Sequence, residues 1–140
     1  MVIQLECEKI LKDRGLRITK PRMSILEQFI SHPNALSHND IEEKILDIDR
    51  ITLYRTLKSF EEKGVIHKAI DGTDKPKYAL CESSCSEHAH NHDSHLHFRC
   101  DNCENTFCIE GVPIPAIPIP AGYQVNGTDV VLNGICINCS

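Results

Sequence analysis

The sequence contains no tryptophan, and aromatic residues make up only 5% of its 140 residues. A chain this poor in aromatic side chains is not expected to build one large core, and two small units stapled by metal fit its length better. It also has no apolar run of membrane-spanning length, and no signal peptide precedes its first amphipathic segment. We therefore expect a cytoplasmic protein without a membrane partner, whose cysteines bind metal rather than form disulfides.

Basic residues are scarce in the second half of the chain. Residues 1–68 hold 12 of the 15 lysines and arginines, whereas residues 69–140 hold 3 of them and 9 acidic residues. The net charge of -5 argues against a generally basic nucleic-acid binder. Any contact with nucleic acid is therefore expected in the first half.

Two C-x-x-C pairs, Cys100 with Cys103 and Cys136 with Cys139, stand in the second half. Four thiolates in two such pairs can close a tetrahedral shell around zinc. A thioredoxin-like redox pair should open a helix after a strand, and neither pair here is placed in that way. The spacing predicts a structural zinc site made of these four cysteines.

The first half has the periodicity of four short helices. Apolar residues recur at helical spacing among charges, and Gly15, Thr19, Ser37 and Asp49 supply stop and cap signals. In the fourth helix Leu53, Leu57 and Phe60 face inward. The opposite face carries the polar and basic residues Thr52, Arg55, Lys58 and Ser59, the order expected of a helix-turn-helix. A plain helical bundle with a solvated charged face is the alternative.

The next residues favour the helix-turn-helix. Residues 65–70 and 77–80 are predicted to be short strands joined by the turn-forming residues 71–74. Helices closed by such a hairpin make a winged helix, whose wing lies beside the recognition helix.

Residues 81–94 are rich in His, Ser and Asn and predict a hinge or loop. Strands are expected at 95–99, at 106–109, and around Val125 and residues 130–132. The proline-rich residues 112–120 cannot form a regular helix and should run extended. The exposed sheet edges and this apolar strip predict a homodimer interface.

Taken together, the chain resembles the ferric uptake regulator family of bacterial metal sensors. Residues 15–22 (GLRITKPR) look like the family's entry to its second helix, and residues 51–57 (ITLYRTL) look like its recognition-helix signature. The His-rich stretch followed by the two C-x-x-C pairs matches its dimerisation domain. The resemblance implies an α+β protein that is not an enzyme, with a winged-helix domain at 1–80, a hinge and His-rich loop at 81–94 and a small α/β metal-binding dimerisation domain at 95–140.

The implied function is metal-dependent repression of transcription by a dimer bound to a double-stranded DNA operator. The candidate DNA contacts lie at the entry to the second helix and on the recognition helix, with Tyr54 and Arg55 implied by the resemblance. They are Arg17, Lys20, Arg22, Thr52, Tyr54, Arg55 and Lys58.

Departures from the family's iron-sensing pattern indicate the metal. Ala79 and Cys108 stand where iron-sensing members usually have glutamates, and Cys81 follows Tyr78-Ala79-Leu80 in a Tyr-x-Leu-Cys ending similar to zinc uptake regulators. Thiolate and imidazole ligands favour zinc. The regulatory candidates are therefore His67, Cys81, His95, His97 and Cys108. We take Cys81, His95 and His97 as the centre of this set, with His67 or Cys108 as the fourth ligand, and Cys85 as a possible replacement for Cys81.

Three alternatives remain open. One is an iron- or peroxide-responsive regulator of the same family, with iron or manganese as the second metal. Another is a hydrolytic zinc enzyme, although no H-E-x-x-H or H-x-E signature places a general base. The third is a metal-storage or zinc-ribbon module, which leaves the helix-turn-helix unexplained.

Overall fold

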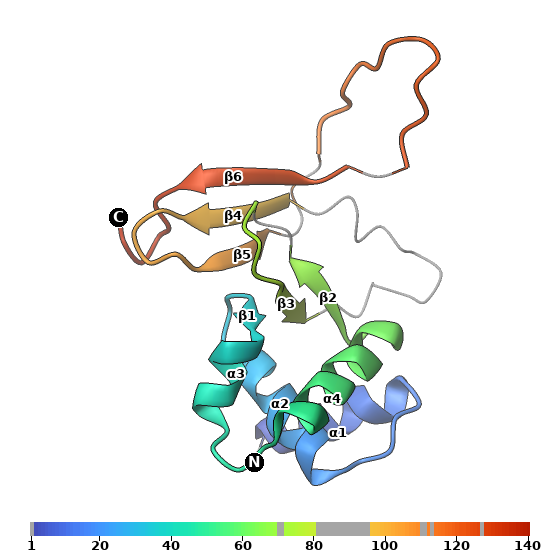
Figure 1. Ribbon diagram of the computed structural model, residues 1–140, viewed down its shortest axis with the longest axis vertical. Helices are drawn as coiled ribbons and strands as arrows, with labels where there is room; N and C mark the ends of the chain where they lie inside the picture. Colours follow the sequence, from blue (N-terminus) through green and yellow to red (C-terminus); the bar gives the residue numbers. More distant parts are fainter. Residues whose placement is uncertain (1, 70–71, 81–95, 110–111, 113, 127) are drawn as a thin grey trace.

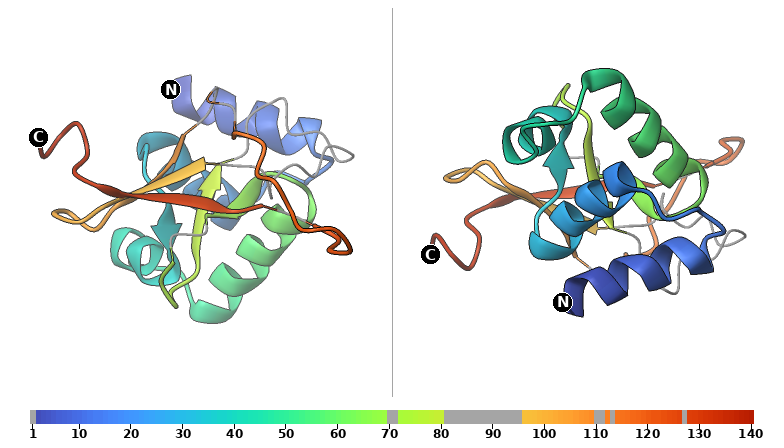
Figure 2. Two further views of the ribbon diagram at one scale, coloured as in Figure 1. Left: turned by 90° about the horizontal axis from the view of Figure 1, so that it is seen from above. Right: turned by 90° about the horizontal axis from the view of Figure 1, so that it is seen from below.

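The computed structural model describes residues 2–69, 72–80, 96–109, 112, 114–126 and 128–140. Its first part holds the four expected helices: α1 (Val2–Asp13), α2 (Lys20–Ser31), α3 (His38–Lys44) and α4 (Arg50–Glu62). Seen from below, α2 lies between α1 and α4 (Figure 2). The fold class predicted from the sequence, α+β with an N-terminal winged helix, is confirmed.

Capping residues set the helix ends. The Thr19 hydroxyl accepts a hydrogen bond from the Arg22 N–H at the start of α2, and Ser37 with Asp40 forms a capping box at the start of α3. Gly15 and Gly64 follow α1 and α4 with φ angles of 71° and 74°, which glycine adopts without strain.

The helices enclose an apolar core with the first strands. Leu53, Leu57 and Phe60 are buried as predicted, and Cys7 is a core residue. Thr56 is also buried, which the apolar stripe did not predict. Its hydroxyl donates to the Thr52 carbonyl, so this buried polar group is hydrogen-bonded. The cluster consists of Cys7, Leu11, Leu16, Ile25, Leu26, Phe29, Leu36, Ile41, Leu53, Leu57, Phe60, Val65, Ile66 and Tyr78.

The wing is formed by β2 (Ile66–Ala69) and β3 (Lys77–Leu80), paired antiparallel with His67 opposite Ala79. A third strand, β1 (Leu36–Ser37), pairs with the other edge of β3, giving the order β1-β3-β2. The sequence did not predict β1, because two residues carry no detectable period.

The second sheet contains β4 (Leu96–Cys100), β5 (Thr106–Ile109) and β6 (Val130–Gly134) in the order β5-β4-β6. β4 pairs antiparallel with β5 and parallel with β6. The expectation of a strand at Val125 is wrong, because this residue lies in the loop before β6. In Figure 1 this sheet lies above the helices, with β1, β2 and β3 between the two layers.

The proline-rich segment is not helical, as predicted. Its described residues from Val112 to Asn126 form neither helix nor strand and project as a long loop from the second sheet (Figure 1). Several apolar side chains there are exposed, including Ile117, Ile119 and Tyr123. Among the described residues, no helix is both long and apolar enough to span a membrane.

Candidate metal centres

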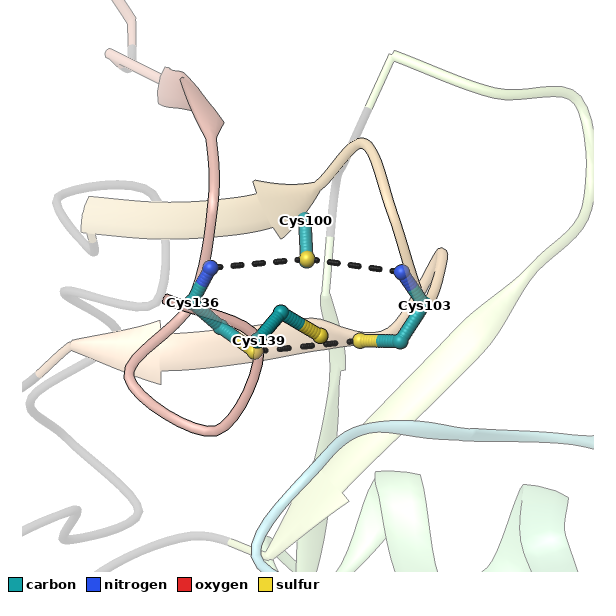
Figure 3. A group of neighbouring side chains, drawn as sticks. All are labelled: Cys100, Cys103, Cys136 and Cys139. Atoms are coloured by element: carbon teal, nitrogen blue, oxygen red, sulfur yellow. Dashed lines mark hydrogen bonds between the residues drawn. The ribbon is translucent and has the colours of Figure 1, made fainter.

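The four cysteines of the two C-x-x-C pairs lie together at the end of the second sheet. Cys100 ends β4, Cys103 lies in the β4–β5 turn, and Cys136 and Cys139 lie in the turn that follows β6 (Figure 3). Their sulfur atoms all lie within 4.8 Å of one another. The parallel pairing of β4 with β6 brings together the two C-x-x-C turns, here called knuckles, since Gly134 is the partner of Cys100.

Backbone donors surround the sulfur of Cys100. The N–H groups of Cys103 and Cys136 both donate to this sulfur at 3.4 Å (Figure 3). These two donors lower the pKa of the Cys100 thiol to about 6. The Asn105 backbone lowers the pKa of Cys103, but desolvation and the three neighbouring sulfurs together raise it to about 11. The Cys100 thiol therefore ionises more readily than the Cys103 thiol, and a bound cation would favour the thiolate form of both.

The four-cysteine group fits zinc. A tetrahedral shell with bonds of about 2.3 Å separates neighbouring sulfurs by roughly 3.8 Å. The sulfurs of Cys103 and Cys136 are 3.8 Å apart. The knuckle at Cys136 is closed by its own carbonyl, which accepts from the N–H groups of Cys139 and Ser140. All four positions of the shell have a protein donor, which is typical of a structural rather than a catalytic site.

A second group joins the two sheets. His67 on β2, His97 on β4 and Cys108 on β5 have ligand atoms within 4.8 Å of one another. The Cys108 sulfur is 3.6 Å from His67 Nε2, and the ring centroids of His67 and His97 are 6.3 Å apart. His97 and Cys108 are cross-strand partners, so they share one face of the second sheet. Both histidines are buried, and Cys108 is half-buried.

The structure brings together three of the five regulatory candidates. The sequence treated His67 and Cys108 as alternatives for one position, whereas both lie in the group with His97. No period or spacing in the sequence signals that pairing, since it depends on how the wing meets the second sheet. Cys81 and His95 lie outside the described residues, as do Cys85, His88, His90 and His92.

The donor set of this three-residue group is two nitrogens and one sulfur. Such ligands suit zinc better than magnesium, calcium or manganese, which prefer oxygen. Three donors leave room for one more in a tetrahedral shell. In sequence, Cys81 follows the last residue of β3, and His95 precedes the first residue of β4.

The candidate DNA-contact residues lie on α4, on α2 and just before α2, in the helical layer that Figure 1 shows below the second sheet. Tyr54, Arg55 and Lys58 are exposed on α4, whereas Thr52 is half-buried. Arg17 and Lys20 are exposed near the start of α2. Arg22 is half-buried there, and its guanidinium donates to the Arg17 carbonyl at 2.7 Å. An exposed basic face on α4 is what a recognition helix requires.

Comparison with known proteins gives one consistent result. The model of the ferric uptake regulator family matches residues 13–119. A ferric uptake regulation protein of Neisseria meningitidis is 30% identical over 138 residues, covering 92% of this chain and 90% of that protein.

Solved structures show the same fold. A zinc uptake regulator complexed with zinc and DNA has a TM-score of 0.64 and 23% identity, covering 99% of this chain and 93% of that chain. The Vibrio cholerae ferric uptake regulator has a TM-score of 0.57 and 22% identity, covering 92% and 98% of the two chains.

Proposed function

Since this chain belongs to the ferric uptake regulator family of metal-responsive transcriptional regulators, we propose that it is a zinc-responsive repressor that binds its operator as a homodimer. Members of this family are regulators, so the chain is not an enzyme. We place its winged helix at residues 1–80, the hinge at 81–94 and the dimerisation domain at 95–140, and we place the protein in the cytoplasm.

The observation that carries the proposal is the convergence of His67, His97 and Cys108. These residues come from both sheets, and they offer nitrogen and sulfur but no oxygen. A zinc ion there would be held by His67 on the wing and by His97 and Cys108 on the second sheet. We propose that Cys81 or His95 completes the set. These residues would fix the wing against the second sheet, and thereby orient α4 for DNA.

The four-cysteine group has a different role in this proposal. All four of its ligands belong to the second sheet and the turns at its end. Metal held there would stabilise that unit and would stay bound while the regulatory metal exchanges. For a site of this kind, the binding free energy is folding free energy.

DNA would meet the exposed face of α4. Arg55 and Lys58 are exposed next to Tyr54, and Arg17 and Lys20 lie at the approach to α2. A two-fold dimer would place two copies of α4 in successive major grooves, with half-sites about one helical turn apart. The zinc uptake regulator of similar fold, which was solved with zinc and DNA, supports this proposal.

An iron-responsive regulator is the second candidate, because the curated relatives are named ferric uptake regulation proteins. Ferrous iron and manganese favour sites with carboxylate oxygens. Among the described residues, neither candidate group includes a carboxylate. The donor chemistry therefore favours zinc over the metal in the relatives' names.

The test pairs metal analysis with DNA binding. The purified protein is analysed for metal before and after mild chelation, and its operator is selected from random-sequence DNA by the zinc-loaded protein. We expect chelation to remove one zinc per chain, leave the second in place and abolish operator binding. Added zinc should restore binding at lower free concentration than manganese or ferrous iron. Operator binding that is independent of metal, or restored best by iron, would exclude a zinc-responsive repressor.

A further inference from the structure

The winged helix and the second sheet are also joined by direct contacts that involve neither metal group. The Ala35 N–H, just before β1, donates to the Thr106 carbonyl at 2.7 Å. The Lys77 ammonium, at the start of β3, donates to the Thr106 hydroxyl at 3.3 Å and to the Glu104 carbonyl at 3.1 Å. Thr106 is fully buried, and it accepts from the residue before β1 and from the first residue of β3.

Small side chains allow the two units to approach closely. Ala69 and Ala79 on the wing form a buried cluster with Ala35, just before β1, and Cys108 packs against it. Cys108 is also a member of the three-residue group. The contact at Thr106 and the convergence of His67, His97 and Cys108 are therefore two parts of one interface.

The turn that holds Cys100 and Cys103 positions the Glu104 carbonyl, which accepts from Lys77. Glu104 directly follows Cys103, and its φ of 64° makes it the one non-glycine residue with positive φ in the described part of the chain. Its N–H donates to the Cys100 carbonyl at 2.9 Å. The turn thereby presents this carbonyl at a fixed place, which a lysine on a flexible stem can reach.

We propose that Lys77 and Thr106 form a latch that holds the wing against the second sheet and so pre-organises His67, His97 and Cys108 for the regulatory metal. This proposal rests on the proposed function. Lys77 is a positioning residue here, since it touches neither metal group. A latch of this kind lowers the cost of bringing the ligands together, so the apparent metal affinity rises in proportion to the fraction of molecules that is docked.

The first measurement needs neither the regulatory metal nor DNA. Amide hydrogen exchange at Ala35, followed by NMR in protein with only the four-cysteine site loaded, reports opening of the interface directly. Lys77→Met keeps the length of the stem and removes the donor. We expect it to speed exchange at Ala35 about threefold to tenfold, the effect of losing an ordinary hydrogen bond at a partly exposed position. Exchange at Val65, whose N–H bonds to Phe60 within the winged helix, should not change.

Matched variants separate the latch from other roles of Lys77. Lys75→Met removes a lysine from the exposed turn before β3 and should leave Ala35 exchange unchanged. Thr106→Val replaces the hydroxyl that accepts from Lys77 with a methyl group, and should act like a milder Lys77→Met. Thr106→Ser should restore exchange to within about twofold. Ala35 exchange in the double variant should be no faster than in Lys77→Met alone, because both changes remove the same contact.

The second measurement is the affinity for the second zinc in DNA-free protein, by competition with a chelating dye. We expect Lys77→Met and Thr106→Val to weaken it by the factor by which each lowers the docked fraction, which follows from the protection of the Ala35 amide. The latch is wrong if Ala35 exchange is unchanged in both variants. It is also wrong if the docked fraction falls in a variant while its zinc affinity stays at the wild-type value, or if the effects of the two changes on Ala35 exchange add fully. A wild-type protein that takes up no second zinc would refute the proposed function instead. Ala35 exchange would still test the latch, because that measurement does not need the second zinc.

Discussion

Cys136→Ser should destroy the second sheet and leave the winged helix folded. Serine is close to cysteine in size, and the Cys136 backbone makes the local hydrogen bonds of its knuckle, so the substitution removes mainly the sulfur ligand. The sulfur lies 3.8 Å from that of Cys103 in a buried position. The expected consequence is loss of metal from the four-cysteine site.

The size of the effect follows from what the second sheet buries. Among the described residues from 96 onward, the buried side chains are His97, Cys100, Thr106 and Cys136, with no buried leucine, isoleucine, valine or phenylalanine. Full burial of one side chain of these four types would stabilise the fold by about 1.5–3 kcal/mol. A structural zinc contributes roughly 10–16 kcal/mol. Even a third of that, lost with one ligand, is on the order of 3–5 kcal/mol, which a sheet without an apolar core cannot replace.

The helices should survive because their core is separate. Residues such as Ile25, Leu26, Leu53 and Phe60 are fully buried among themselves. We therefore expect far-UV circular dichroism to keep its helical signal while the NMR amide signals of β4, β5 and β6 collapse. Native mass spectrometry should show no zinc in the four-cysteine site. Size exclusion should show aggregates or monomers.

Cys7→Ala is the matched control, since Cys7 is a buried cysteine of the helical core outside both metal groups. It should lower thermal stability and keep both the zinc and the dimer. A stable, metal-free dimer of Cys136→Ser would refute the reasoning, because the second sheet would then fold without the energy that we assign to the metal.

Three further predictions concern other parts of the chain. Arg55→Ala should weaken operator binding by about 1–3 kcal/mol if Arg55 reads a base edge, and should leave the dimer intact; unchanged affinity at matched salt would rule out α4 as the reading helix. Cys81→Ser should keep one zinc per chain and the dimer, but lose the second metal and bind the operator weakly, and His95→Ala should behave in the same way. Wild-type repression by either variant would show that the regulatory site lies elsewhere. Burial, with smaller contributions from Glu27 and Glu6, raises the pKa of Cys7 from 9.0 to about 11. Native Cys7 should therefore resist iodoacetamide at pH 8, and the stability that its neutral thiol contributes should be complete below pH 9 and decline as the pH rises toward 11. Rapid native alkylation at pH 8, mapped by mass spectrometry, would contradict this.

Much of the first half could be predicted because its signals are local. Thr19, Ser37 and Gly15 mark helix ends through contacts within a few residues, and the structure has them as expected. Leu53, Leu57 and Phe60 repeat at helical spacing and are buried. The two-residue strand β1 and the burial of Thr56 were not predicted, because neither contributes to a hydrophobic period.

The second half was harder to predict because its order comes from long-range pairing. The parallel pairing of β4 with β6 joins segments some thirty residues apart, and it places Gly134 opposite Cys100. The cysteine spacing nevertheless gave the four members of the first group, since a tetrahedral shell constrains which residues can share it. Nothing local placed Cys108 beside His67, because that contact depends on how the wing docks on the second sheet.

The two groups differ in a way that assigns them different tasks. The ligands of the four-cysteine group all lie at one end of one sheet, so no movement of the wing separates them. His67 lies on the wing and His97 with Cys108 on the second sheet, so any arrangement that moves the units apart also breaks this group. A ligand shifts a conformational equilibrium only as far as it binds one state more tightly. A metal held by all three residues would bind only the docked state, so it would favour that state by nearly its whole binding energy at this interface. The first group therefore suits stability, and the second suits a response to metal concentration.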